Sequence, residues 1–456
     1  MSRPHATFWA PSALLGDVWV DGVRIHVNEI GDVASIDSGG PHPGDQRLPG
    51  AVIPGMPNLH SHAFQRALLG RTQRKGPGDD SFWTWREAMY GSLDHLGPVE
   101  VEAITAWLCV ELLEGGFTQL GEFHYVHHQP DGTPYADRAE LARRVIAGAR
   151  TAGMGLTMLP VLYAASGFGP LPPSHGQRRF IDSADGVLRL IDALRPECGP
   201  DLRLGLAPHS LRAVPPEALE EALVGLPSDA PVHIHIAEQT AEVRACQAWS
   251  GKRPIAWLLD HHDVDGRWCL VHATHLDADE LDRVARSGAV VGLCPTTEAD
   301  LGDGVFPATD LIAGGGHYGV GTDSHVGRSA PAELRLLEYG QRLRDQRRIR
   351  VLGPEDAHAG AALWRDAARG GAQALGVLAG SIAPGHRADF VSLDPEHAVL
   401  EGLSGDALLD GLVLGQGDTA VHTVVSGGRV VVEAGRHHRR DALRAPFRRA
   451  IQRLFP

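Results

Sequence analysis

Short apolar runs recur along the chain from about residue 51 onward, each followed by a longer segment of mixed polarity. The runs are AVIPGMPNLHSH (51–62), FTQLGEFHYVHH (117–128), LTMLPVLYAA (156–165), LRLGLAPHSLRAV (202–214), APVHIHIAEQ (230–239), RWCLVHATHLD (267–277), AVVGLCPTT (289–297) and HYGVGTDSH (317–325). Continuous runs of this kind, rich in β-branched residues, are typical of strands buried in a parallel sheet. The pattern therefore predicts eight such strands.

The segments between these runs show the pattern of amphipathic helices. The clearest are VEVEAITAWLCVELLEGG (99–116), RAELARRVIAGARTAG (138–153), PPEALEEALVGL (215–226) and DADELDRVARSG (277–288). Several have acidic residues in the first turn and a glycine just past the end, as helix termini prefer. The alternation predicts an α/β fold, and the eight repeats indicate a TIM-like (β/α)8 barrel over residues 51–379.

The two ends of the chain show a different pattern, in which apolar and polar residues alternate between tight turns. LGDVWVDGVRIHVNEIGDVASIDSG lies within residues 14–50, and ADFVSLD and TAVHTVVSGGRVVVEAGR lie within residues 380–436. Alternation broken by Asp-Gly and Gly-Gly turns indicates antiparallel strands. We therefore expect residues 1–50 and 380–456 to build one small β-sandwich beside the barrel, followed by a terminal helix.

Composition narrows the classes of partner. The chain has 456 residues, of which 43% are hydrophobic, and no apolar stretch is long enough to span a membrane. A net charge of −14 argues against nucleic acid and anionic membranes as partners, although arginines inside a pocket can still hold a small acidic substrate. The N-terminus lacks the apolar core of a secretion signal, so we expect a cytoplasmic protein.

Polar side chains gather where the predicted strands end. They are His60, His62, Glu122, His124, Tyr125, His209, Arg212, His235, Glu238, His272 and Asp323. The carboxyl ends of barrel strands surround the active-site mouth, so these residues are functional candidates. His60-x-His62 alone is a weak signal, because two histidines on one strand face also occur in solvated or core positions. Three imidazoles and one carboxylate together form a ligand set suited to Zn²⁺ or Fe²⁺.

The motifs at these strand ends resemble those of the amidohydrolase superfamily. The resemblance rests on PGMPNLHSH, HIHIAEQ, LVHATHL, GVGTDSH and, near the C-terminus, GSIAPGHRADFVSLD and VVSGGRVVVEAGR, and it covers essentially the whole chain. It implies a metal-dependent hydrolase with a barrel and a sandwich. By position, the resemblance assigns one divalent metal ion, Zn²⁺ with Fe²⁺ as the alternative, to His60, His62, His235 and Asp323.

Two details of this ligand set depend on spacing. His233 competes with His235, and we favour His235 because it stands three residues before Glu238, as the H-x-x-E motif of the superfamily requires. Many members hold two metals bridged by a carboxylated lysine on the fourth strand. The only lysines here, Lys75 and Lys252, lie on no predicted barrel strand. A single-metal site of the deaminase type is therefore expected.

Other candidates keep two interpretations. Glu122 is an alternative bridging carboxylate, but we favour a structural hydrogen-bond acceptor. The cysteines form no C-x-x-C pair, which argues against a thiolate metal site or a disulfide framework. Glu238 is the candidate proton shuttle, and Asp323 is expected both to bind the metal and to hydrogen-bond the nucleophile. His272 either orients the nucleophile or is a buried structural histidine.

Two arginines suggest the substrate class. Arg86 in FWTWREAMY and Arg212 in APHSLRAV carry guanidinium groups that pair well with carboxylates, although an arginine in a barrel loop also serves as a surface ion pair. With HSHAFQR and GEFHYVHH, these motifs resemble the deiminases of formimino amino acids. That resemblance implies hydrolysis of N-formimino-L-glutamate to N-formyl-L-glutamate and ammonia in histidine degradation, and suggests a homodimer. The residues that it assigns to the substrate are Gln65, Arg86, Tyr125, His209 and Arg212.

Two other functions stay open. An aminohydrolase of a purine or related heterocycle would use the same metal ligands, but a neutral base gives no reason for two arginines. A non-catalytic scaffold is expected to have lost ligands or the acid–base carboxylate, which are all present here. The loop FGPLPPSHGQRRF (168–180) is either a lid that places His175, Arg178 and Arg179 over the site or a solvated connector. RTQRKGPGDD (71–80) is either a segment that orders on substrate binding or an exposed turn.

Overall fold

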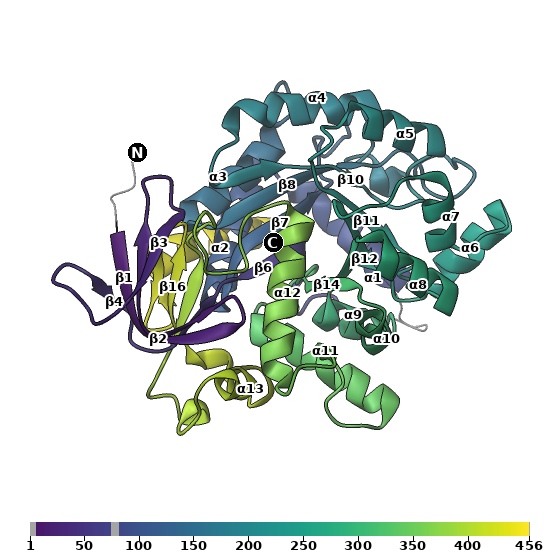
Figure 1. Ribbon diagram of the computed structural model, residues 1–456. Helices are drawn as coiled ribbons and strands as arrows, with labels where there is room; N and C mark the ends of the chain where they lie inside the picture. Colours follow the sequence, from purple (N-terminus) through teal and green to yellow (C-terminus); the bar gives the residue numbers. More distant parts are fainter. Residues whose placement is uncertain (1–5, 74–81, 456) are drawn as a thin grey trace.

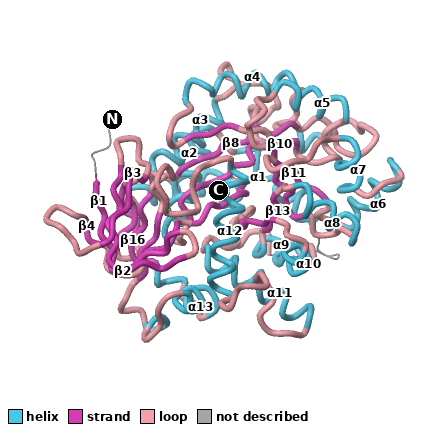
Figure 2. The backbone as a smooth tube through the Cα atoms, in the orientation of Figure 1, coloured by secondary structure: helices cyan, strands magenta, loops and turns pink. Residues whose placement is uncertain are grey.

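The computed structural model describes residues 6–73 and 82–455, which form a barrel and a smaller sheet beside it (Figure 1). The barrel strands are β6 (Met56–Ser61), β7 (Phe117–His124), β8 (Gly155–Leu162), β9 (Leu202–Leu204), β10 (Ala207–Pro208), β11 (Val232–Ile236), β12 (Trp268–His272), β13 (Val290–Leu293) and β14 (His317–Val320). Each runs parallel to the barrel strands with which it pairs. Figure 2 shows helices around the outside of these strands.

Backbone hydrogen bonds and bridges close the barrel strands into a ring. β6 to β10 form one hydrogen-bonded sheet and β11 to β14 form another. Bridges from Leu206 to Val232 and from Ser210 to His235 join the two sheets on one side. On the other side, a bridge from Ser61 to Asp323 joins the end of β14 to β6. The closed parallel barrel confirms the predicted fold class.

The structure contains the helices predicted at 99–116, 138–153, 215–226 and 277–288, which are α2, α3, α5 and α8, together with others. The helices are α1 (Phe82–Ser92), α2 (Pro98–Glu114), α3 (Glu140–Ala152), α4 (Ala184–Leu194), α5 (Pro216–Gly225), α6 (Thr240–Ser250), α7 (Pro254–His261), α8 (Ala278–Ser287), α9 (Pro295–Leu301), α10 (Ala308–Ala313), α11 (Ala330–Asp345), α12 (Ala359–Leu375), α13 (Asp406–Leu414) and α14 (Arg440–Leu454). In α8 the reason for the bounds is local: Asp277 and Glu280 form a capping box, and left-handed Gly288 ends the helix.

Both ends of the chain contribute strands to one nine-stranded sheet. Its strands are β1 (Ala6–Leu15), β2 (Val18–Val27), β3 (Val33–Ser38), β4 (Gln46–Arg47), β5 (Val52–Pro54), β15 (Phe390–Leu393), β16 (Val421–Ser426), β17 (Arg429–Glu433) and β18 (Arg436–His437). The two halves share a core of their own, in which the rings of Phe8 and Phe390 lie edge to face at 5.2 Å. Figure 1 shows this sheet, purple and yellow, at one side of the barrel.

The boundary between the two parts differs from the prediction by a few residues. The predicted first barrel strand, 51–62, is two strands, because β5 pairs with β15 of the terminal sheet while β6 pairs with β7 of the barrel. Gly55 separates them, and a Cβ at this position would lie 2.4 Å from the Thr118 side chain. The terminal sheet therefore extends to Pro54, beyond the predicted boundary at residue 50, and its first strand begins at Ala6, within the predicted segment 1–50.

The terminal segment is attached to the barrel by aromatic and ionic contacts. Phe447 of α14, the predicted terminal helix, stacks on Trp107 of α2 with ring centroids 5.5 Å apart. Buried Arg387, just before β15, donates to Asp201 of the barrel at 2.7 Å and also pairs with Asp389. Among the described residues, we find no helix with both the length and the apolar character needed to cross a bilayer.

Candidate metal centre and active site

The strand ends at the seam of the barrel hold the central histidines in place. The carbonyl of His60 accepts the backbone N–H groups of Thr322 and Asp323 at 3.1 and 3.0 Å, and the N–H of His62 donates to the carbonyl of Asp323 at 3.1 Å. The first and last strands of the barrel thus meet at residues predicted as metal ligands. Asp323 adopts a left-handed conformation with φ 44°, which is strained for an aspartate and typical of functional positions.

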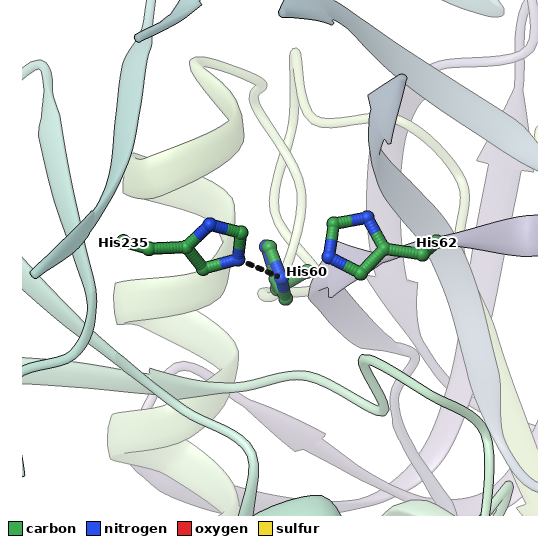
Figure 3. Close-up of side chains that lie close together, drawn as sticks. All are labelled: His60, His62 and His235. Carbon is green, nitrogen blue, oxygen red and sulfur yellow. Dashed lines mark hydrogen bonds between the residues drawn. The ribbon is translucent and has the colours of Figure 1, made fainter. Parts of the chain in front are cut away.

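Three imidazoles point toward one another at this seam (Figure 3). The Nε2 atoms of His60 and His235 lie 3.1 Å apart. Asp323 Oδ1 lies 3.5 Å from His60 Nε2 and 3.4 Å from His62 Nε2. One ligand atom from each of His60, His62 and His235 lies within 4.8 Å of the others, and the same holds for His60, His272 and Asp323.

The protonation of these imidazoles suits a metal ion. His62 Nδ1 faces the carbonyl of Phe123 at 3.0 Å, and His235 Nδ1 faces the carbonyl of His209 at 3.1 Å. A carbonyl only accepts, so Nδ1 carries the proton and Nε2 keeps its lone pair for the centre. Burial lowers the pKa of His60 to about 3 and also lowers the pKa of His62 and of His235. A set of neutral imidazoles and one carboxylate fits a divalent ion such as zinc.

Asp323 and His272 form a charged pair beside the cluster. Burial raises the pKa of Asp323, but its hydrogen bond to His60 and the nearby histidines outweigh burial and hold that pKa well below its usual range. His272 Nδ1 contacts Glu298 Oε1 at 3.2 Å, and its Nε2 lies 3.8 Å from Asp323 Oδ2. Burial lowers the pKa of His272, but Glu238, Glu298 and Asp323 together raise it to about 10.

Glu238 is held at the cavity by the turn after β11. The preceding Ala237 has φ 51°, a conformation that an alanine rarely adopts. The N–H of Glu238 donates to Glu242 Oε2 at 3.1 Å, which holds this turn in place. Burial raises the pKa of Glu238 to about 7. A carboxylate with that pKa can both accept and return a proton near neutral pH.

A cavity joins the cluster to the predicted substrate residues. It is lined by His62, His235, Glu238, His272 and Asp323, and also by Gln65, Arg86, Tyr125, His209 and Arg212. His60 does not line it and has no exposed surface. All five residues that the resemblance assigned to the substrate therefore face the same space as the candidate proton shuttle.

The two arginines of this cavity keep donors that nothing satisfies among the described residues. Arg212 forms no ion pair with a described carboxylate, and Arg86 has only Glu87, whose side chain is 70% exposed, at 3.8 Å. The Nε atoms of Arg86 and Arg212 are buried and have no hydrogen-bond partner in the described part of the chain. The same is true of Gln65 Oε1, while Gln65 Nε2 donates to the hydroxyl of Tyr125 at 2.8 Å. Buried polar groups of this kind are typical of a ligand site.

The apolar and aromatic wall of the cavity was not predicted from the sequence. The residues concerned are Trp85, Met89, Tyr90, Tyr163, Phe180 and Leu301. A signal exists for those in α1: Trp85, Arg86, Met89 and Tyr90 recur at spacings of three and four, so they share one helix face. Apolar side chains with this spacing usually indicate a core face, so the signal does not by itself predict a pocket.

The structure distinguishes the two interpretations of Glu122 and the two candidates His233 and His235. Glu122 accepts the Ser61 hydroxyl at 2.7 Å and the Ala63 N–H at 2.8 Å, and it does not line the cavity, so it acts as a structural acceptor. His233 is buried with Nε2 at 2.7 Å from the carbonyl of Ala374 in α12, on the outside of the barrel strands. Its ring therefore lies away from the cluster that contains His235.

The cysteines are free, as expected, but one lies near the site. Cys294 Sγ is close enough to His272 and Glu298 to form a group of three candidate ligands. Burial raises the pKa of this thiol well above its ordinary value, which disfavours the thiolate that binds metals. The His60, His62 and His235 group therefore remains the better candidate.

The loop at residues 168–180 is a packed connector rather than a lid. Buried Arg179 donates to the backbone carbonyls of His128, Leu93 and Leu96, two of which follow α1. Arg178 donates to Asp94 at 2.6 Å, and its Nη1 donates to the carbonyl of His175 at 2.9 Å. Only Phe180 of this loop lines the cavity. The second loop, 71–80, lies mostly outside the described residues.

The chain is similar in sequence to amidohydrolases over most of its length. The sequence profile of the Amidohydrolase family matches residues 51–431. The formimidoylglutamate deiminase of Pseudomonas aeruginosa is 51% identical over 433 residues, which cover 95% of this chain and 96% of that protein. The 5-methylthioadenosine/S-adenosylhomocysteine deaminase of Natronomonas pharaonis is 29% identical and covers 91% of this chain and 88% of its own length.

Solved structures agree with the fold. The crystal structure of an amidohydrolase from Brucella melitensis superposes with a TM-score of 0.94 at 48% identity, covering 99% of this chain and 100% of the other. An adenosine deaminase from Xanthomonas campestris with bound zinc is only 23% identical but has a TM-score of 0.80 over 98% of both chains, which shows the shared fold. The chain therefore belongs to the amidohydrolase family.

Proposed function

We propose that the protein hydrolyses N-formimino-L-glutamate to N-formyl-L-glutamate and ammonia, a step of histidine degradation. The observation that carries the proposal is one cavity in which a cluster of neutral histidines with an ionised aspartate faces two arginines with unsatisfied buried donors. The 51% identity to a formimidoylglutamate deiminase over nearly the whole chain supports the same substrate.

The arginines favour this substrate over a heterocycle. A guanidinium binds a carboxylate through two parallel hydrogen bonds, and N-formimino-L-glutamate has two carboxylates, one on the carbon that carries the formimino nitrogen and one at the end of the side chain. Arg86 and Arg212 would take the carboxylates, and the free Gln65 Oε1 can accept an N–H of the substrate. A neutral purine would leave both partly buried cations without a counter-charge from the ligand, which is unfavourable.

His60, His62, His235 and Asp323 would hold the metal, for which we propose zinc. When bound, the ion would act as a Lewis acid that lowers the pKa of a water molecule, so that the water can lose a proton and become a nucleophile near neutral pH. The family relationship, the donor chemistry of these four residues and the zinc-containing adenosine deaminase of the same fold support this choice.

The protein side chains then handle the protons. Glu238 takes a proton from the attacking water and delivers it to the nitrogen that leaves as ammonia, and its pKa of about 7 suits both transfers. His272, positioned by Glu298 and with its pKa raised by the surrounding carboxylates, can donate a hydrogen bond toward the tetrahedral centre as negative charge develops there. Asp323 stays ionised beside it.

Ammonia release from N-formimino-L-glutamate by the zinc-loaded protein tests the function. We expect efficient release with N-formyl-L-glutamate as the co-product, and no release from adenosine or guanine assayed in parallel. Release from a heterocycle alone would replace this proposal with the aminohydrolase function. The Glu238→Gln variant, prepared in the same way, is the control for contaminating activity.

A further inference from the structure

Trp83 of α1 contacts both arginines of the cavity. The guanidinium carbon of Arg86 lies over the indole ring at 4.6 Å from its centroid, and that of Arg212 lies over the same ring at 5.6 Å. Tyr90 follows Arg86 by one helical turn, and the guanidinium carbon of Arg86 also lies over the Tyr90 ring, 5.6 Å from its centroid. One aromatic ring thus joins two cations from different elements, α1 and the loop after β10.

The way in which a guanidinium is held decides what it can still bind. An ion pair with a protein carboxylate occupies the N–H edge, which is the edge that recognises a substrate carboxylate. An aromatic ring instead contacts the planar face through its quadrupole and leaves the N–H edge available. The buried Nε atoms of Arg86 and Arg212 lack hydrogen-bond partners in the described part of the chain, as this second arrangement requires.

Holding two like charges in one cavity also needs a compensating group. Glu238 and Glu242 act electrostatically on Arg212, but neither forms an ion pair with it. The electron-rich face of a tryptophan attracts both guanidinium groups and offsets part of their mutual repulsion. Trp83 does not line the cavity itself, so it acts through the arginines and not by touching the substrate.

We propose that Trp83 is a specificity-determining positioning residue: its indole ring orients Arg86 and Arg212 by their faces, so that both present free N–H edges to a dicarboxylate. The inference deepens the proposed function and rests on it. It predicts that the ring matters for binding of acidic ligands and not for the chemical step.

Trp83→Leu tests the proposal by its separate effects on KM and kcat. We expect KM for N-formimino-L-glutamate to rise about tenfold, with kcat changed by less than about threefold, because cation–π contacts to two guanidinium groups are lost. Trp83→Phe, which keeps a smaller ring, should give an intermediate KM. In an Arg212→Ala background, Trp83→Leu should raise KM by less than it does in the wild type.

Trp19→Leu serves as the matched control, because Trp19 is a half-buried tryptophan of β2 in the terminal sheet. It should leave KM unchanged. An unchanged KM in both Trp83 variants, or a loss confined to kcat, would overturn the role of the ring. Should the wild type fail to hydrolyse N-formimino-L-glutamate, the proposed function fails, while calorimetric binding of glutarate still tests the ring. Weaker binding of glutarate by Trp83→Leu supports the inference, and equal binding overturns it.

Discussion

At the scale of single residues, the pKa of each carboxyl group in or near the site depends on the residues around it. Asp323, surrounded by histidines, stays ionised, whereas burial raises the pKa of Glu238 to about 7. Burial likewise raises the pKa of Glu122 to about 8, but Ser61 and Ala63 already occupy its oxygens. Of these three carboxylates, only Glu238 therefore combines a suitable pKa with access to the cavity, which is the combination that a proton shuttle needs.

Glu238→Gln should remove proton transfer and little else. We expect kcat to fall by about 10³-fold or more, since general acid–base catalysis contributes about 10² to 10⁴. The metal content, measured by atomic emission, should match the wild type, because Glu238 is not among the candidate ligands. A variant with near wild-type kcat would show that another group carries the proton.

Arg212→Ala should weaken binding instead. Loss of a guanidinium that pairs with a substrate carboxylate is expected to raise KM by about 10²-fold with a smaller effect on kcat. Arg212→Lys should recover part of the loss, because it restores the charge without the planar pair of donors. Steady-state kinetics of the two variants would contradict the assignment if KM stayed at the wild-type value in both.

The residues that the sequence predicts for the site share one property. His62, His235, Glu238 and Asp323 lie at or just after the ends of apolar strands, and the parallel barrel brings all strand ends to one mouth, so a one-dimensional pattern is enough to group them. Trp83 and Tyr163 could not be grouped in this way. Their aromatic side chains are also common in cores, and only the tertiary packing shows that Trp83 contacts two arginines.

At the scale of elements, hydrophobic periodicity predicts that a strand or helix exists better than it predicts where that element begins and ends. The fourth barrel strand is predicted as one run, 202–214, but is two short strands interrupted at Gly205. A Cβ at Gly205 would lie 2.5 Å from the carbonyl oxygen of Pro231, the residue just before β11. This close approach depends on a partner that is distant in sequence, so no local pattern reveals it. The membership of β5 in the terminal sheet has the same origin.

The loop at 168–180 gives a prediction at this scale, because Arg179 connects it to the segment after α1. Arg179→Ala would leave three backbone carbonyls without their buried donor, and we expect the free energy of unfolding to fall by about 3 kcal/mol. KM should also rise, since α1 carries Arg86. Denaturant unfolding and kinetics check both effects, and Arg195→Ala, on an exposed turn, is the control.

At the scale of the whole molecule, the candidate metal ligands lie on the seam where the first and last strands close the barrel. Ligands from β6, β11 and the end of β14 would be joined by one ion. That the protein forms a homodimer stays a prediction. A bound ion stabilises only the closed state, so removing it should destabilise the entire fold.

Removal of the metal by a chelator should therefore lower the thermal midpoint by about 5 °C, and added zinc should restore it. His62→Ala should show the lower midpoint with or without the chelator, because it lacks one candidate ligand. Differential scanning calorimetry measures all three samples. Equal midpoints for the loaded and stripped wild-type protein would argue against a metal at the seam.

The seam also affects the order of events during synthesis. His60 and His62 leave the ribosome early, but their backbone partners, Thr322 and Asp323, are made more than half a chain later. Until the last barrel strand docks against the first, the nascent chain has no complete set of ligands. Complete metal binding would therefore follow the synthesis of Asp323, and truncated translation products that stop before residue 323 should be recovered without the ion. The ligand set would thus be complete only once the first and the last strands of the barrel have both been made.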